Sequence, residues 1–202
     1  QAIAPGVMDL VITTKGAAFD ESLYHALPPK MKIVWTDFSP GGKLDTVSKI
    51  RWVPNMGFEL SLPSVKIYEG RMKAKAFPYA LSELQADLSY IGETCEIKSF
   101  SAKHDDTRIR GRGSALLPPQ GRWVLTLSDL FADDISPDRQ FRQALPSGVR
   151  TVVEELDPQR PFSLSGGIRL SGTEREIDPL TASWSLNFVF TGGQLNTGIQ
   201  LK

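Results

Sequence analysis

Two stretches of the chain show the same succession of patterns, a helical period followed by a strand period. They begin at Asp20 and Asp138, and 138 − 20 gives a spacing of 118 residues. In the first stretch, apolar residues recur at i, i+4, i+7, i+8 and i+11, which marks one face of a helix; they are Leu27, Met31, Val34, Trp35 and Phe38. Alternating apolar residues then indicate a strand. The same order at the same spacing predicts an internal repeat.

The ends of the helices can be predicted from a few residues. Asp20 and Asp138 are placed as N-caps, because a carboxylate there accepts hydrogen bonds from free amides of the first turn. Pro28-Pro29 and Pro146 divide each helical stretch into a short first helix and a longer second one. Each unit therefore contains a pair of helices.

Between the helical pairs the pattern is that of strands alone. Turns are predicted at Glu69-Gly70, with the chain returning as a strand over 72–76, at Gly92-Glu93 and at His104-Asp105-Asp106. A change of parity near Ser99 indicates a β-bulge. Each unit is thus expected to hold six or seven short antiparallel strands with one apolar and one polar face.

These patterns predict a mainly β (α+β) fold, an elongated, curved antiparallel sheet built from repeats of about 118 residues, each with a short helical pair. Because the helices are too few to cover the sheet, we expect the sheet to curl over its own apolar face. Residues 1–202 are interpreted as one continuous segment, with a first unit over about 7–122 and an incomplete second unit over about 123–202.

The strands supply a set of apolar residues that are predicted to point inward. They are Phe58, Leu60, Leu62, Leu84, Leu88, Trp123, Leu125, Leu127, Trp184, Leu186 and Phe188. Two interpretations are open. The residues pack together as a closed core, as apolar strand faces usually do, or they line a continuous trough that holds lipid acyl chains.

Several runs resemble a known family. They are the run Ala76–Leu81, the alternating strand Leu84–Tyr90, the run Ala102–Gly111, and Ala144–Val149 followed by Glu155–Pro158. Together they are similar to the repeat units of AsmA-like, or TamB-like, bacterial envelope proteins. The resemblance covers residues 60–202, and the internal repeat extends it to 1–60.

The resemblance implies a U-shaped sheet with an apolar groove that conducts lipids between membranes and supports outer-membrane biogenesis. It further implies a periplasmic location in the cell envelope. Phospholipid acyl chains and adjacent repeats of the same chain are the expected partners. Membrane attachment would come only through sequence missing here. The alternative is a structural or interaction module with a closed dry core, whose sheet edges stack on neighbouring repeats.

Charge and composition narrow the function classes. The chain has 23 Lys and Arg and 23 Asp and Glu, so its formal charge is zero. A protein that binds nucleic acid through phosphates normally carries a basic excess, so no nucleic-acid partner is expected. The longest apolar runs have three residues, which predicts no membrane-spanning helix. Cys95, His25 and His104 are too few for a metal site, and no cofactor is expected.

Three further groups of residues are candidates for chemistry. Arg108, Arg110 and Arg112 alternate and share one strand face, where they meet an anionic surface or form a solvated face balanced by Asp87 or Glu96. His104 beside Asp105 and Asp106 suggests either a general base or, more simply, a hairpin turn. Cys95 is expected to be an inert, buried thiol. No catalytic motif is found, and the chain is predicted not to be an enzyme.

Overall fold

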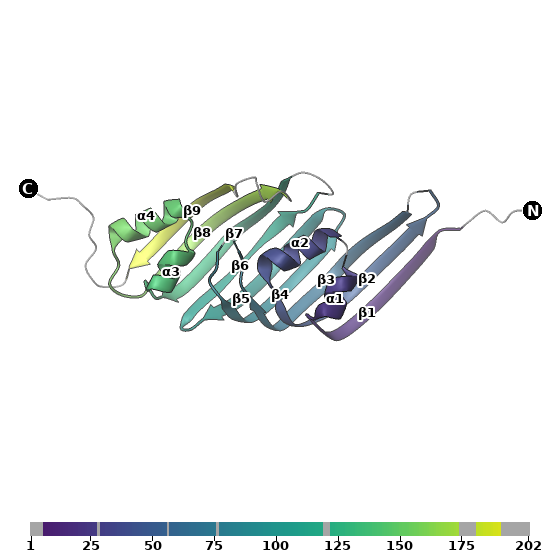
Figure 1. The fold of residues 1–202 in the computed structure, drawn as a ribbon, viewed down its shortest axis with the longest axis horizontal. Helices are drawn as coiled ribbons and strands as arrows, with labels where there is room; N and C mark the ends of the chain where they lie inside the picture. Colours follow the sequence, from purple (N-terminus) through teal and green to yellow (C-terminus); the bar gives the residue numbers. More distant parts are fainter. Residues whose placement is uncertain are drawn as a thin grey trace, which may run out of the picture.

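The computed structural model describes residues 6–27, 29–55, 57–75, 77–118, 122–173 and 181–190. Over these residues nine antiparallel strands form one open sheet whose spatial order follows the sequence (Figure 1). The prediction of a mainly β fold built on an antiparallel sheet is confirmed. The strands are β1 Met8–Ala18, β2 Gly41–Val53, β3 Gly57–Met72, β4 Leu81–Ile91, β5 Thr94–His104, β6 Thr107–Leu116, β7 Arg122–Ile135, β8 Phe162–Thr173 and β9 Thr181–Phe190.

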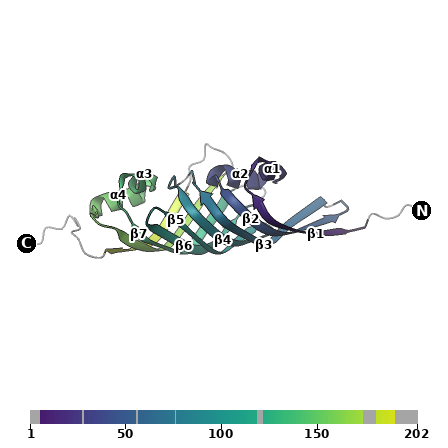
Figure 2. The ribbon, with the colours of Figure 1, turned by 90° about the horizontal axis from the view of Figure 1, so that it is seen from below.

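Two helical pairs interrupt the succession of strands. The first, α1 (Glu21–Ala26) and α2 (Pro29–Phe38), joins β1 to β2; the second, α3 (Arg139–Ala144) and α4 (Ser147–Leu156), joins β7 to β8. Both pairs lie on the same side of the sheet (Figure 2). Each boundary of the second pair lies 118 residues after its counterpart, since 139 − 21 and 156 − 38 both give 118. The predicted division of each helical stretch at its proline is confirmed.

The caps of the two pairs match as well. A carboxylate oxygen of Asp20 accepts a hydrogen bond from Leu23 N at 2.9 Å, and Asp138 accepts one from Phe141 N at 2.8 Å. Both N-cap predictions are therefore confirmed. The second helices end alike, because Ser39 and Asp157, 118 residues apart, adopt positive φ angles of 45° and 40°.

The strands that precede the helical pairs carry the same irregularity. The register of β1 shifts between Thr14 and Ala17, and that of β7 shifts between Ala132 and Ile135. Gly16 and Asp134, again 118 residues apart, sit in these shifts with φ angles of 66° and 58°. A bulge in the left-handed region thus turns both strands toward their helices.

The predicted turn at Glu69-Gly70 is wrong. β3 runs through this position to Met72, and the two residues form a bulge against β2 instead. A Cβ atom on Gly70 would lie 2.7 Å from the carbonyl oxygen of Leu84, so glycine permits a close approach of two strands here. The predictions of turns at 92–93 and 105–106 and of a bulge near Ser99 are confirmed.

The strand predicted over 72–76 is also wrong for its described residues. After β3 the chain leaves the sheet and binds the end of α2, where Lys73 N donates to Phe38 O at 3.0 Å and Lys75 N donates to Asp37 O at 2.8 Å. The alternation that suggested a strand reflects an extended connection whose amides pair with helix carbonyls rather than with a neighbouring strand. Ala76 lies outside the described residues.

The pairing register divides the side chains between two faces, because residues opposite each other in an antiparallel pair project to the same side. One unbroken row crosses all nine strands and contains only apolar residues or glycine: Ala17, Leu44, Ile67, Ala86, Phe100, Gly111, Leu130, Gly166 and Leu186. We call this side the apolar face. The opposite side, the polar face, carries rows such as Gln85, Ser101, Arg110, Phe131, Ser165 and Asn187.

The main core lies where α3 and α4 cover the apolar face. Phe141 and Val153 from these helices are buried with Ile135 of β7 and Phe162 of β8, and Tyr79 reaches the same cluster from the connection before β4. Val153 and Ile135 each keep only 1% of their surface exposed. None of the helices in the described ranges has the length and hydrophobicity needed to cross a bilayer.

Candidate functional site

All eleven residues predicted to point inward lie on the apolar face. They come from β3, β4, β7 and β9, and the register links them directly or through residues two positions away on the same strand. Trp123, Leu125 and Leu127, for example, lie opposite Gly172, Leu170 and Ile168. Period-two alternation was sufficient to assign these side chains to one side.

The eleven residues differ greatly in how far they are covered. Leu84 is 6% exposed and belongs to the core beneath α3 and α4, whereas Phe58 is 72% and Trp184 37% exposed. The other members of the set are partly buried, with exposed fractions between these extremes. The set therefore includes closed core as well as open apolar surface.

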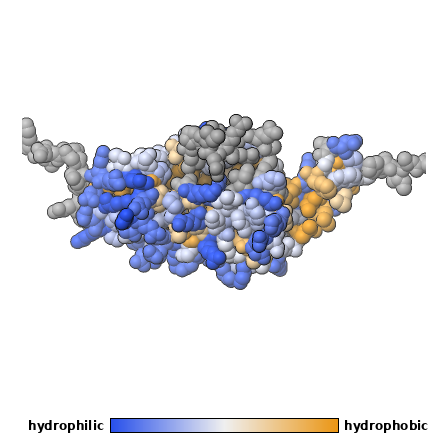
Figure 3. Space-filling view, viewed as in Figure 1, coloured by the Kyte–Doolittle hydropathy of each residue, from blue (hydrophilic) through white to orange (hydrophobic). Residues whose placement is uncertain are grey.

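The open part is concentrated at the N-terminal end of the sheet. Met8, Leu10 and Ile12 of β1 are exposed on the apolar face, and Met8 lies across from Trp52, which in turn lies opposite Phe58. Figure 3 shows this end of the molecule as a hydrophobic area beside the N-terminal strands. We call Met8, Leu10, Ile12, Trp52 and Phe58 the open patch. Sequence reasoning found only Phe58 among them, although alternation in residues 8–12 was a usable signal.

Sequence reasoning also missed residues that close the core. Tyr79 lies outside any strand, and Phe141 lies on a helix of six residues, too short for a clear period. Their ring centroids are 5.9 Å apart in an edge-to-face arrangement, and Phe141 packs against Phe162 at 5.8 Å. This aromatic chain connects the sheet to the second helical pair.

Glycine at the centre of the apolar face leaves space for a neighbouring side chain. A Cβ atom on Gly111 would lie 2.8 Å from the ring of Phe100, the residue opposite it on β5. Glycine thus leaves room for an aromatic ring to lie across the neighbouring strand. In the Gly-Arg-Gly run of β6, the glycines permit packing on the apolar face and Arg112 projects from the polar face.

The three alternating arginines lie on the polar face, but their predicted partners are wrong. Arg112 pairs with Asp129, and Arg110 with Asp133 at 3.4 Å; both acids belong to β7. Of the acids predicted to balance them, Asp87 lies 3.9 Å from Lys98, and Glu96 accepts a hydrogen bond from Ser89. Strand order explains the difference, because β6 lies beside β7, where Asp129 is opposite Arg112 and Asp133 is two residues along from the position opposite Arg110.

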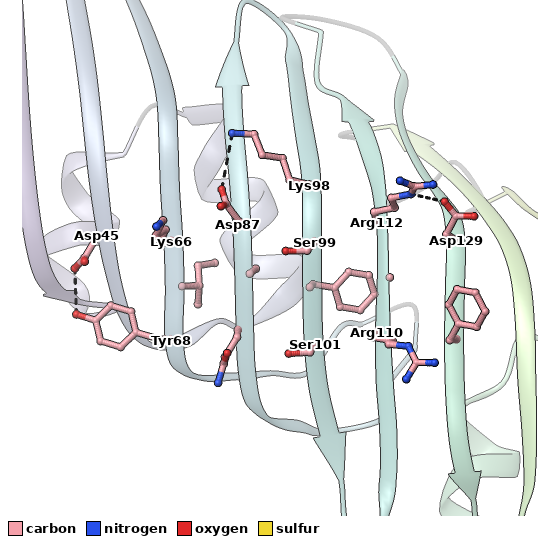
Figure 4. A pocket seen from close by; sticks show the side chains of 16 residues that line it. Asp45, Lys66, Tyr68, Asp87, Lys98, Ser99, Ser101, Arg110, Arg112 and Asp129 are labelled. Carbon is pink, nitrogen blue, oxygen red and sulfur yellow. Dashed lines mark hydrogen bonds and ion pairs between the residues drawn. The ribbon is translucent and has the colours of Figure 1, made fainter.

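A shallow hollow of about 840 Å³ lies over the polar face between β2 and β7 (Figure 4). Most of its charged side chains have partners: Asp45 accepts from the Tyr68 hydroxyl at 3.1 Å, and Lys98 and Arg112 pair with acids, whereas Lys66 has no ion pair with the described residues. A surface that neutralises most of its own charges in this way has only a weak field with which to attract an ion.

His104 is buried at the end of β5, with its Nε2 atom 3.6 Å from a carboxylate oxygen of Asp105. Its ring stacks on Tyr79 with centroids 3.7 Å apart, and its Nδ1 lies 2.6 Å from the carbonyl oxygen of Ala80, which can only accept. Nδ1 therefore carries the hydrogen. Asp105 and Asp106 form the predicted turn. Burial raises the pKa of Tyr79 beside it.

The other candidate groups are isolated from one another. Cys95 is partly buried on the apolar face of β5, where burial raises the pKa of its thiol and keeps it protonated. His25 is exposed on α1, 3.7 Å from Glu21. Across the described residues, no three His, Cys, Asp or Glu side chains come together as a metal site.

No protein-family model, curated protein or solved structure matches this chain.

Proposed function

We propose that this chain holds lipid acyl chains along the apolar face of its sheet, as a non-enzymatic module of a lipid-handling envelope protein. The observation that carries the proposal is the unbroken apolar row across nine strands, together with an open patch that the helices leave uncovered. The resemblance to AsmA-like repeats points to the same function.

The physical basis is the burial of methylenes. Each acyl methylene transferred from water to an apolar surface contributes about 0.8 kcal/mol, so a long apolar strip binds a chain without specific contacts. Exposed apolar surface of this kind is costly to a soluble protein unless something covers it. The side chains of the open patch would form one end of such a strip.

The proposal includes a finer description of the architecture. The sheet curls into a groove, and the two helical pairs recur as parts of 118-residue units that begin near residues 7 and 123. Equal spacing of helices, caps and bulges supports such units. Function in the periplasm, outer-membrane assembly and attachment to a membrane through other sequence rest on the family resemblance.

The test is direct detection of lipid on the purified chain. Native mass spectrometry and solvent extraction should find phospholipid bound after purification from a bacterial host, and fluorescent fatty acid should bind to the delipidated protein. Protein that reproducibly carries no phospholipid and binds no fatty acid would overturn the proposal.

A matched pair of phenylalanines tests which face of the sheet binds lipid. Phe58 is exposed on the apolar face and Phe131 is exposed on the polar face, where its ring lies under Arg110. Phe58→Asp should reduce fatty-acid binding by about tenfold, because a carboxylate opposes burial of the acyl chain. Phe131→Asp should leave binding unchanged. Equal effects of the two substitutions would place the ligand elsewhere.

A second function is favoured by the other half of the sheet. Beneath α3 and α4 the apolar side chains form a closed core, with Tyr79 and Phe162 almost fully buried. A structural or interaction module of an envelope assembly needs such a core and no lipid. It predicts self-association that persists after complete delipidation.

A further inference from the structure

The outer edge of β1 is an open strand edge among the described residues. β1 pairs with β2 on one side and stands at the end of the strand order. It is exposed along most of its length, and Val11 on the polar face is 61% exposed, in addition to the apolar residues of the open patch. Unpaired backbone groups beside exposed apolar side chains are a template for another strand.

The internal repeat shows which strand would not fit this edge. β7 corresponds to β1 and is covered by β6, with Arg108 opposite Asp133 and Arg112 opposite Asp129. Subtracting 118 places Lys15 where β7 has Asp133 and Val11 where it has Asp129. A strand like β6 would set an arginine against Lys15, and like charges directly opposite are destabilising.

A second copy of β1 fits in one register. If two copies run antiparallel with facing residue numbers that add up to 24, Asp9 of each lies opposite Lys15 of the other, since 9 + 15 is 24. Ile12 then lies opposite Ile12, and Val11 opposite Thr13. In registers whose facing numbers add up to 22 or 26, Asp9 no longer lies opposite Lys15. A sum of 18 sets Asp9 opposite Asp9, and a sum of 30 sets Lys15 opposite Lys15.

We infer that the chain forms a two-fold symmetric dimer through its β1 strands in this register. A two-fold axis perpendicular to the sheet keeps both apolar faces on the same side. The pairing covers the exposed edge and satisfies its backbone groups. It also joins the two open patches at the axis, so the apolar face continues from one sheet into the other. The inference goes beyond the proposed function, and its test requires no lipid.

Sedimentation velocity over a concentration series measures the association. The wild-type chain should convert reversibly from monomer to dimer. Asp9→Lys and Lys15→Asp should each raise the dissociation constant by about tenfold or more, because each places two like-charge pairs in the ladder. The double variant Asp9→Lys/Lys15→Asp should restore it to within about threefold of the wild type.

One control separates the edge from the interior of the sheet. Asp9 lies 3.8 Å from Arg51 of its own chain, so Asp9→Lys also removes that ion pair. Arg51→Gln removes the same pair without changing the edge, and the dissociation constant should stay at the wild-type value. Near-UV circular dichroism checks that each variant is folded.

Cross-linking tests the register. In a Cys95→Ala background, Ile12→Cys should give covalent dimer with a short thiol cross-linker. Ser48→Cys, at the residue opposite Ile12 on β2, should not. A monomer at every soluble concentration, a dimer indifferent to the charge reversals, a folded double variant that stays monomeric, or cross-linking through Val189→Cys on β9 instead would each overturn the inference.

Discussion

The two helical pairs have the same backbone but are covered to different extents. In the second pair, Phe141, Val149 and Val153 are buried against the sheet. In the first, no residue of α1 is buried, and Trp35, the counterpart of Val153, is only partly covered. Local sequence thus sets the shape of each pair, while the neighbouring strands decide how much stability it contributes.

The difference follows from the position of each pair in the sheet. The second pair lies among β4 to β9, which supply Leu84, Ala102 and Phe162, and the connection before β4 adds Tyr79. The first pair connects the edge strand β1 to β2, and its second helix ends against the chain that follows β3. In this pair the ring of Trp35 packs against Tyr24 of α1 and against Phe19 just before α1, with ring centroids 5.7 Å and 5.4 Å apart.

The largest effect should come from truncating equivalent positions, Phe141 in α3 and Leu23 in α1. Phe141→Ala should lower the free energy of unfolding by about 3–5 kcal/mol, because it empties a closed aromatic site. Leu23→Ala should lower it by about 1 kcal/mol, because Leu23 is only partly buried. Urea unfolding measures both.

A further variant, Phe141→Leu, allows the same leucine-to-alanine step to be compared at both positions. From this variant, the step to alanine removes the same atoms as Leu23→Ala, so any remaining difference reflects burial alone. Equal losses at the two positions would show that the first pair is as firmly packed as the second, contrary to the structure.

The N-caps should have a smaller effect. Asp138→Ala should lower the free energy of unfolding by about 1 kcal/mol, whereas Asp138→Asn, which keeps the acceptor oxygen, should have almost no effect. Asp20→Ala removes the same hydrogen bond in α1, but its consequence should be local. We expect faster amide hydrogen exchange in α1 with less than half the global loss. A full global loss for Asp20→Ala would contradict this difference.

Much of the fold could be predicted from local signals. Aspartates before helices, prolines within them and alternation along strands fixed the caps, the division of each pair and the face of all eleven inward residues. What failed depended on neighbouring strands. Glu69-Gly70 has the composition of a turn, yet the glycine serves the approach of β4. The partners of Arg110 and Arg112 required knowing that β7 lies beside β6.

The smallest effect at neutral pH concerns Tyr79, which covers α3 but has no counterpart in the described residues beside α1. Burial raises its pKa, so the folded chain keeps the phenol proton at a pH where the unfolded chain, with a pKa of about 10, loses it. The contribution of the protonated phenol to the free energy of unfolding is therefore complete below about pH 10 and is lost as the pH rises toward the folded-state pKa.

Tyr79→Phe tests this contribution. It should lower the free energy of unfolding by about 0.5–1 kcal/mol at pH 7, where it removes only the weak contact with Thr107. It should also make the alkaline decline of stability shallower. Tyr68, Tyr90 and Cys95, whose pKa values burial also raises, would contribute to the slope that remains. Parallel alkaline curves for the wild type and Tyr79→Phe in urea unfolding would mean that the phenol is solvated, and that the second helical pair is less closed than its packing indicates.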